Sequence, residues 1–194
     1  MKNPGMRFAF ILLAALVIPI ASAQEAATKP AAANPSPTAA ASPSQTLLWF
    51  WNDIGRKLTA MAEDFPEDKY DFKPNPVQRS FAEQLIHAAH GIIIYDDLVR
   101  GVKPQLDDPK RSELKNKAAV VEYVRKAFTD GAALIASKGD KGMDDLIVDP
   151  WSNHQFRVSE YAWFFLEHSG EHYGQLVVYY RVAGLVPPES RPKK

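Results

Sequence analysis

Hydrophobic side chains recur every three or four residues in four segments of the chain, and this spacing predicts four amphipathic helices. The segments are residues 47–62, 81–100, 117–137 and 161–183. The first segment carries its apolar stripe at Leu48, Trp51, Ile54, Leu58 and Met61. We find no internal repeat and no alternation of apolar and polar residues of useful length. The pattern therefore predicts an all-α protein built as a four-helix bundle.

Residues with capping or helix-breaking chemistry mark the ends of these segments. Ser80 and Glu83 have the spacing of a capping box, in which each side chain bonds an unpaired backbone amide at a helix start. Gly139 and Gly142 are expected to end the third helix, and Ser159 is expected to be the N-cap of the fourth. Gly184, which two prolines soon follow, predicts that the fourth helix stops there.

The first 45 residues differ in composition from the rest of the chain. Two basic residues precede an uncharged apolar run, and the small residues at 21–23 suit signal peptidase, so residues 1–23 are expected to be a signal peptide. Residues 24–45 hold eight Ala and four Pro among 22 positions, which predicts a disordered linker. The bundle domain is expected to span residues 46–191. Cleavage near Ala23 would leave a secreted or periplasmic protein.

Charge and composition exclude several classes of protein. Without Lys2 and Arg7, 21 basic side chains stand against 23 acidic ones, and there is no basic stripe suited to nucleic acid. No later segment is apolar for about 18 residues, so we expect no integral membrane segment after processing. Cysteine is absent, so any metal site must use nitrogen and oxygen ligands.

His168 and His172 are the most informative candidate site residues. Residues four apart on a helix share one face at about 5–6 Å from each other, so two imidazoles at this spacing can hold one metal ion. The same face carries apolar residues that include Phe165 and Leu176, so both imidazoles are expected to point toward the core. The alternative is that each buried histidine only hydrogen-bonds to a carboxylate or a carbonyl.

A third ligand can come from the second predicted helix, which carries His87 and His90. That helix is apolar nearly all round, so its pattern leaves both residues open. Gly91 lies one turn from His87 and has no side chain, so a ligand or a neighbouring helix can come close to the helix face that carries His87. This slightly favours His87 over His90 as the third ligand. His154 falls in a predicted loop, where an ordinary hydrogen-bonding role is expected.

Four sequence blocks, which occur in the same order, resemble the DinB-like (YfiT-like) family. They are DFPEDKYDFKP at residues 64–74, RSFAEQLIH at 79–87, HSGEHYGQL at 168–176 and GLVPP at 184–188. The resemblance extends over nearly all of residues 48–191. It implies a four-helix bundle with long crossover connections.

The same resemblance implies a metal site in which His87 joins His168 and His172, whereas His90 matches no ligand position. Two features depart from the family pattern. Many relatives carry Arg where this chain has Tyr173, so no role of that Arg carries over. The expected export signal is the second departure, because characterised relatives are mostly intracellular.

Three neutral imidazoles leave a divalent ion at least one open position, which suits a water molecule or a thiolate. The resemblance implies both options, since the family includes proposed metal-dependent hydrolases and transferases that use low-molecular-weight thiols. An exported protein meets little reduced thiol, so hydrolysis of an unknown small substrate ranks above thiol S-transfer. A non-catalytic bundle that binds a metal or a ligand is the competing class, and the sequence leaves open whether the protein is an enzyme.

The sequence defines the remaining features of the site less sharply. Imidazole suits Zn, Ni, Fe, Mn or Co, so the identity of the divalent metal ion stays open. Gln175 is expected to steer a ligand or a bound water beside the histidines. Candidate proton shuttles are Glu83, Glu171, Tyr95 and Tyr179, each of which also has a common structural role. The resemblance also raises the expectation of a homodimer.

Overall fold

The computed structural model describes residues 40–192, and these residues form a four-helix bundle. Its helices are α1 (Pro43–Asp64), α2 (Phe81–Val99), α3 (Lys117–Gly142) and α4 (Val158–Val182). Two short 3-10 turns, η1 (Glu67–Lys69) and η2 (Pro188–Ser190), follow α1 and α4. The expected signal peptide and most of the expected linker lie outside the described residues.

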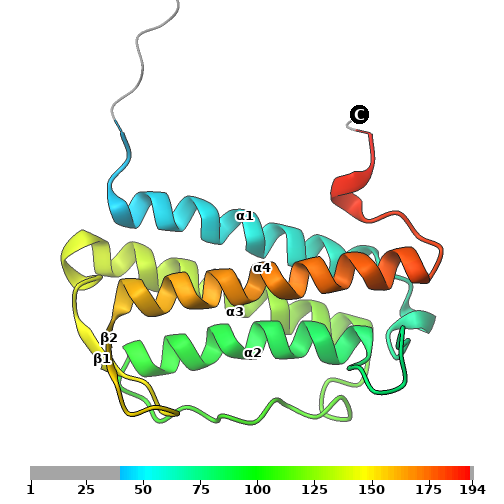
Figure 1. Ribbon diagram of the computed structural model, residues 1–194, viewed down its shortest axis with the longest axis horizontal. Coiled ribbons are helices and arrows are strands. Elements are labelled where there is room, and N and C mark those ends of the chain that lie inside the picture. Colours follow the sequence, from blue (N-terminus) through cyan, green and yellow to red (C-terminus); the bar gives the residue numbers. More distant parts are fainter. Residues whose placement is uncertain (1–39, 193–194) are drawn as a thin grey trace, which may run out of the picture. The chain divides into compact units, whose positions relative to one another are not determined.

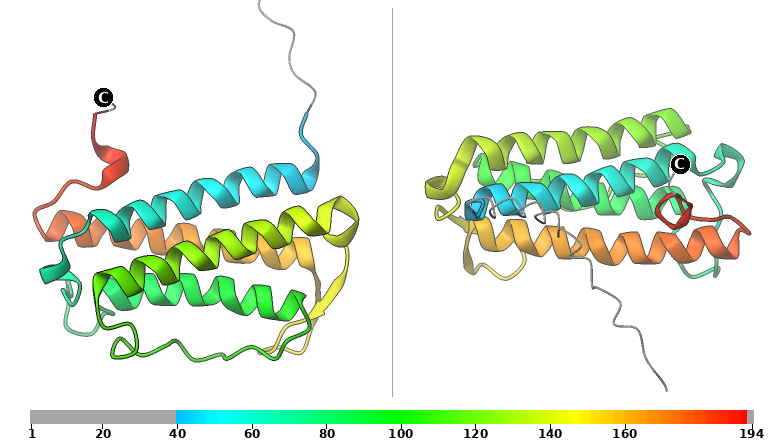
Figure 2. Two further views of the ribbon diagram at one scale, coloured as in Figure 1. Left: turned by 180° about the vertical axis from the view of Figure 1, so that it is seen from behind. Right: turned by 90° about the horizontal axis from the view of Figure 1, so that it is seen from above.

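The four helices are not arranged in the order of the sequence. α1 and α2 lie diagonally opposite, and each packs against both α3 and α4 (Figures 1 and 2). The α2–α3 connection, residues 100–116, runs along the length of the bundle, and the other two connections cross its ends (Figure 1). α2 and α4 are therefore antiparallel neighbours, so side chains from distant parts of the sequence meet between them.

α1 begins earlier than the apolar stripe predicts. Ser42 and Gln45 form a capping box, and Pro43 occupies the first turn, where its missing amide costs nothing. The Ser42 hydroxyl also donates to Asp140 at 3.0 Å, which ties this start to the end of α3. The last residues assigned to the linker, 43–45, are therefore helical, because capping chemistry rather than hydrophobicity sets this boundary.

The other helix starts test the predicted caps. The capping box of Ser80 and Glu83 at the start of α2 is confirmed. The prediction that Ser159 caps α4 is wrong, since the N-cap is Arg157 and Ser159 lies inside the first turn. Glu160 accepts a hydrogen bond from the Arg157 backbone amide at 2.8 Å. The amides of Val158 and Ser159 donate to the carbonyls of Asp145 and Met143, so the helix can start two residues before Ser159 without a hydroxyl cap.

The end of α3 agrees with the prediction, whereas the connection that follows differs from it. Gly139 has a φ of 55°, which kinks the helix, and the last turn ends at Gly142. Two strands then pair antiparallel, β1 (Leu146–Val148) with β2 (Gln155–Arg157), and Ile147 faces Phe156. Three residues are too few to show an alternating pattern, which explains why the sequence did not reveal this β ribbon.

Close helix contacts in the core depend on two glycines. Gly131 of α3 lies against the ring of Trp51, and Gly55 of α1 lies against Phe128, where an added Cβ would come within 2.9 Å of the Phe128 ring. Trp51 Nε1 donates to the Phe128 carbonyl at 3.1 Å. The buried stripe of α1 is thus centred between Trp51 and Gly55, and the expected core residue Ile54 is only half-buried.

Within residues 40–192, the helices are too short or too polar to span a membrane.

Candidate metal centre

Three histidines meet between α2 and α4. His87 comes from α2, and His168 and His172 come from successive turns of α4. His168 Nε2 lies 3.4 Å from His87 Nε2 and 3.0 Å from His172 Nε2, and the potential ligand atoms of all three lie within 4.8 Å of one another. The antiparallel packing of α2 and α4 thus brings the predicted triad together.

The spacing of these nitrogens suits a divalent metal ion. Zinc binds imidazole nitrogen at about 2.0–2.1 Å, so the nitrogen ligands of a tetrahedral ion lie about 3.3 Å apart. The 3.0 and 3.4 Å separations in the triad bracket this value. His172 is only 6% exposed, whereas the side chain of His87 is 27% exposed, so His87 is the more exposed of these two histidines.

Asp108 holds His87 in place. Its two carboxylate oxygens lie 2.8 and 3.0 Å from His87 Nδ1, a pairing that directs Nε2 toward the other histidines. Burial is the largest single effect on Asp108 and raises its pKa, but the hydrogen bond with His87 and the nearby charges of His87, Arg79 and His90 together outweigh burial and lower the pKa. Sequence analysis could not reveal this role, because Asp108 lies in an irregular connection with no periodicity to orient it.

His172 is supported by a pair of glutamines. The amide nitrogen of Gln84 lies 2.5 Å from His172 Nδ1 and also donates to Gln175 Oε1. Gln175 is exposed and reaches His172 only through Gln84, so its expected place beside the histidines belongs to Gln84 instead. The signal that points to Gln84 is its position three residues before His87 on the same helix face.

His168 is positioned by packing rather than by hydrogen bonds. Its Nδ1 atom is buried and has no hydrogen-bond partner among the residues that the structure describes. A Cβ added at Gly91 would lie 2.8 Å from the Phe165 ring and 3.3 Å from His168 Cε1. The absence of a side chain at Gly91 therefore allows His168 to approach α2, as the sequence indicated for the neighbourhood of His87.

The surroundings of the triad keep two of its imidazoles neutral. Burial, followed by the proximity of His87, lowers the pKa of His168 to about 4. Burial, followed by the proximity of His168 and His87, lowers the pKa of His172 to about 3. Both rings are therefore uncharged at neutral pH, which is the form that binds metal ions.

His90 lies outside this cluster. Its Nδ1 atom lies 2.8 Å from the Tyr123 hydroxyl, and its Nε2 atom lies 2.9 Å from the Gln105 carbonyl. Both ring nitrogens are thus occupied in holding α2 to α3 and to the long connection. The structure accordingly places His87, and not His90, beside the pair on α4.

The candidate proton shuttles have other contacts. Glu83 caps α2 and lies 3.5 Å from Lys73, and the Tyr179 hydroxyl donates to the Arg79 carbonyl at 2.6 Å. Glu171 is exposed, and the buried Tyr95 hydroxyl has no partner among residues 40–192. None of these four side chains hydrogen-bonds to the triad in the described part of the chain.

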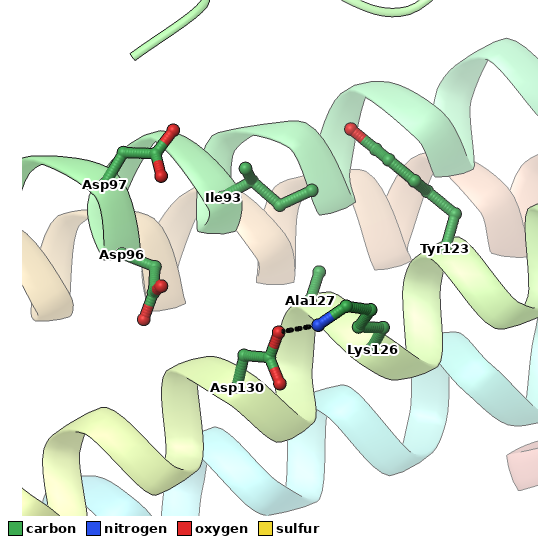
Figure 3. Close-up of a pocket in the computed structure, with 7 residues that line it drawn as sticks. All are labelled: Ile93, Asp96, Asp97, Tyr123, Lys126, Ala127 and Asp130. Carbon is green, nitrogen blue, oxygen red and sulfur yellow. Dashed lines mark hydrogen bonds and ion pairs between the residues drawn. The ribbon is translucent and has the colours of Figure 1, made fainter. Parts of the chain in front are cut away.

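A separate acidic hollow of about 380 Å³ lies between α2 and α3 (Figure 3). Asp96 and Asp97 line it from α2, and the Lys126 ammonium donates to Asp130 across one turn of α3 (Figure 3). Burial, followed by the proximity of Asp96, raises the pKa of Asp97. No histidine lines this hollow, so it is distinct from the triad.

Comparison with known proteins supports both the fold and the family resemblance. The model of the DinB superfamily matches residues 52–176 of the chain. A solved structure, described as "YfiT from Bacillus subtilis is a probable metal-dependent hydrolase with an unusual four-helix bundle topology", is similar with a TM-score of 0.59. The similarity covers 77% of this chain and 93% of that chain at 13% sequence identity, so it shows a shared fold. The search of curated proteins finds no match.

Proposed function

The chain belongs to the DinB superfamily, and on this premise we propose that it is an exported metal-dependent hydrolase of an unknown small substrate. The observation that carries the proposal is the convergence of His87, His168 and His172 within 4.8 Å. The solved YfiT structure, whose description names a metal-dependent hydrolase, adds support through the shared fold. The export part of the proposal is supported only by the composition of the first 23 residues.

The chain's own residues would divide the work of such a site. The three histidines would hold a divalent ion through Nε2, with the Asp108 carboxylate accepting from Nδ1–H of His87. Ligation by His172 Nε2 would require the neighbouring Gln84 amide to turn, so that its oxygen faces Nδ1–H of His172. A divalent ion held there would supply Lewis-acid activation of water and of the bond to be broken. The partial exposure of His87 leaves a side from which a substrate can approach.

Two other functions compete with hydrolysis. A metal centre of this kind also suits thiol S-transfer, which the proposed export makes less favourable because reduced thiols are scarce outside the cell. A non-catalytic bundle would use the triad only to bind a metal or a ligand. A group of three histidines favours catalysis, because purely structural zinc sites are closed by four protein ligands.

Elemental analysis tests the metal centre directly. We expect about one transition-metal ion per chain in the untagged protein of residues 24–194, and loss of this ion in the His168→Ala/His172→Ala double variant. Each single replacement in the triad should lower metal affinity at least about tenfold. If the protein holds no metal even after incubation with Zn or Ni, the proposed metal centre is wrong.

A substrate screen then separates the functions that need a metal. Ester and amide hydrolysis and thiol transfer are measured with the metal-loaded protein and with the double variant as control. Turnover of an ester or amide by the loaded protein alone supports hydrolysis. Turnover only in the presence of a thiol favours transfer, and metal binding without any turnover favours the non-catalytic bundle.

A further inference from the structure

A second hollow, of about 620 Å³, lies where the β ribbon meets the start of α4. Aromatic and acidic side chains make up most of its lining, namely Trp151, Phe156, Tyr161, Phe164, Asp149 and Glu160. No lysine or arginine lines it. We refer to these six residues as the aromatic hollow.

Three rings of the aromatic hollow, those of Phe156, Tyr161 and Phe164, pack against one another in a row. The ring centroids of Phe156 and Tyr161 lie 5.7 Å apart, and Tyr161 stacks on Phe164 at the same distance with an interplanar angle of 25°. Trp151 and Phe164 are 57% and 50% exposed, respectively. Ligand pockets are lined mainly by apolar and aromatic side chains, so exposed rings beside a hollow are typical of a ligand-binding surface.

Trp151 is held in position by a well-bonded turn. The Asp149 amide donates to the His154 carbonyl and the Asn153 amide donates to the Asp149 carbonyl, both at 2.9 Å. Asn153 has a φ of 59°, in the left-handed region that asparagine tolerates better than most residues. The turn thus fixes the backbone from which the exposed Trp151 ring projects beside the hollow.

The charge of the aromatic hollow is negative. Asp149 is only 7% exposed, and it accepts hydrogen bonds from the Tyr161 hydroxyl at 2.6 Å and the Ser152 amide at 2.7 Å. No basic side chain forms an ion pair with Asp149 in the described part of the chain. Glu160 pairs with Arg157 at 2.9 Å, but Arg157 also lies 3.8 Å from Asp144. Acidic groups therefore outnumber basic ones here.

We propose that the aromatic hollow binds an organic ammonium ion, either a protonated amine or a quaternary ammonium group. Aromatic ring faces attract such cations, and the carboxylate of Asp149 adds a favourable charge that a neutral ligand would leave unused. An anionic ligand would meet repulsion from Asp149 and Glu160. Charge and ring content together thus select a cation over the other small-molecule classes.

Phe164 connects this site with the histidine triad. It lies one turn before His168 on α4, and the two rings stack with centroids 6.4 Å apart and an interplanar angle of 24°. A row of rings thus leads from Phe156 through Tyr161 and Phe164 to His168. If the protein is the proposed hydrolase, the bound cation would be the non-reacting end of its substrate. This assignment rests on the proposed function, whereas the binding of a cation in the aromatic hollow does not.

Choline and 3,3-dimethylbutan-1-ol provide a matched pair of probes, because they have nearly the same shape and differ in charge. Isothermal titration of the purified protein should show saturable binding of choline that is at least about tenfold tighter than binding of the alcohol. Equal binding of the two would show an apolar site without charge selection and would overturn the proposal. The same holds if choline does not bind saturably.

Variants locate the binding. Trp151→Ala and Phe164→Ala should each weaken choline binding about fivefold or more, whereas Trp151→Phe should retain most of it because a ring remains. Trp163→Ala is the matched control, since Trp163 is an exposed ring on the same helix outside the aromatic hollow. A Trp163→Ala effect as large as that of Trp151→Ala would place the cation elsewhere and overturn the proposal.

The double variant His168→Ala/His172→Ala separates this proposal from the proposed hydrolase function. It should still bind choline within about twofold of the native protein, because the rings and Asp149 are unchanged. Retained binding together with loss of metal would support the aromatic hollow whatever the triad does. Loss of choline binding in a variant that still melts cooperatively would show that the triad holds the cation, contrary to the proposal.

Discussion

His87 Nδ1 lies 2.8 Å from Asp108 Oδ2, so the long α2–α3 connection reaches back to hold the one histidine that α2 contributes to the triad. The connection follows the length of the bundle because α2 and α3 run in the same direction, so the chain must return to the opposite end before α3 begins (Figure 1). Asp108 thus supports the histidine triad although it lies in neither α2 nor α4, the two helices that carry the histidines.

Replacing Asp108 should weaken metal binding without unfolding the protein. In Asp108→Asn the carboxylate that orients His87 is lost, and we expect metal affinity to fall by about 10–100-fold, as is typical when a ligand's hydrogen-bond partner is removed. Titration with Zn in competition with a chelator measures the change. Asp107→Asn removes a charge from the exposed neighbouring residue and should leave the affinity unchanged, so an equal loss in both variants would contradict the orienting role of Asp108.

Adding one methyl group at Gly91 should disturb both packing and the triad. The Cβ in Gly91→Ala would lie 2.8 Å from Phe165 Cε1, so α2 and α4 must move apart, at a cost of about 1–3 kcal/mol. Urea unfolding and metal titration should both show a loss. Gly170→Ala on α4 is the control, because no atom lies within 4 Å of its added Cβ and the better helix propensity should stabilise the protein by about 0.5–1 kcal/mol.

His90 and His87 should differ in what their removal changes. His90→Ala removes the contacts with Tyr123 and Gln105 and should lower the free energy of unfolding by about 1–3 kcal/mol, while one metal ion per chain still binds. His87→Ala should have the opposite profile, with metal affinity reduced and stability of the metal-free protein nearly preserved. Loss of metal in His90→Ala alone would transfer the ligand role to that residue.

Acid should remove the stabilisation that comes from Asp149. Burial raises the pKa of Asp149, but hydrogen bonds from Ser152 and Tyr161 outweigh burial and hold the pKa below its ordinary value of 3.8. A carboxyl whose pKa is lower in the folded state contributes stability above its unfolded pKa and loses it as the pH falls through the folded pKa.

The Asp149→Asn variant should therefore be less stable than the native protein by about 2 kcal/mol at pH 6, and the difference should shrink below about pH 4. Urea denaturation at several pH values measures this difference. Comparing the two proteins at each pH cancels the titration of the other carboxyl groups. A difference that stays constant down to pH 3 would show that the charge of Asp149 does not contribute.

Much of the fold could be predicted from local chemistry. The periodic apolar residues of α2 and the capping box of Ser80 and Glu83 act within one helix, so the sequence is enough to place that helix start. The start of α4 was misplaced because the amides of Val158 and Ser159 are satisfied by the carbonyls of Asp145 and Met143, and only the fold brings those carbonyls to the helix start. The β ribbon was invisible because each strand has only three residues.

The histidine pair on α4 and its inward direction could be predicted because the spacing of His168 and His172 is a local property of one helix. The choice of His87 over His90 was left open by the helix pattern, since α2 is apolar nearly all round, and the family resemblance supplied it. Gln84 was missed because its contact with His172 spans two helices.

The sequence by itself determined which segments are helical and which face of α4 is buried, because these properties depend on neighbours within a few residues. Only the tertiary structure decided that α2 lies antiparallel to α4, that Asp108 supports His87, and that Phe164 links an aromatic hollow to His168. These relationships join residues far apart in the chain, and their geometry is set by helix packing and by the path of the connections rather than by any local pattern.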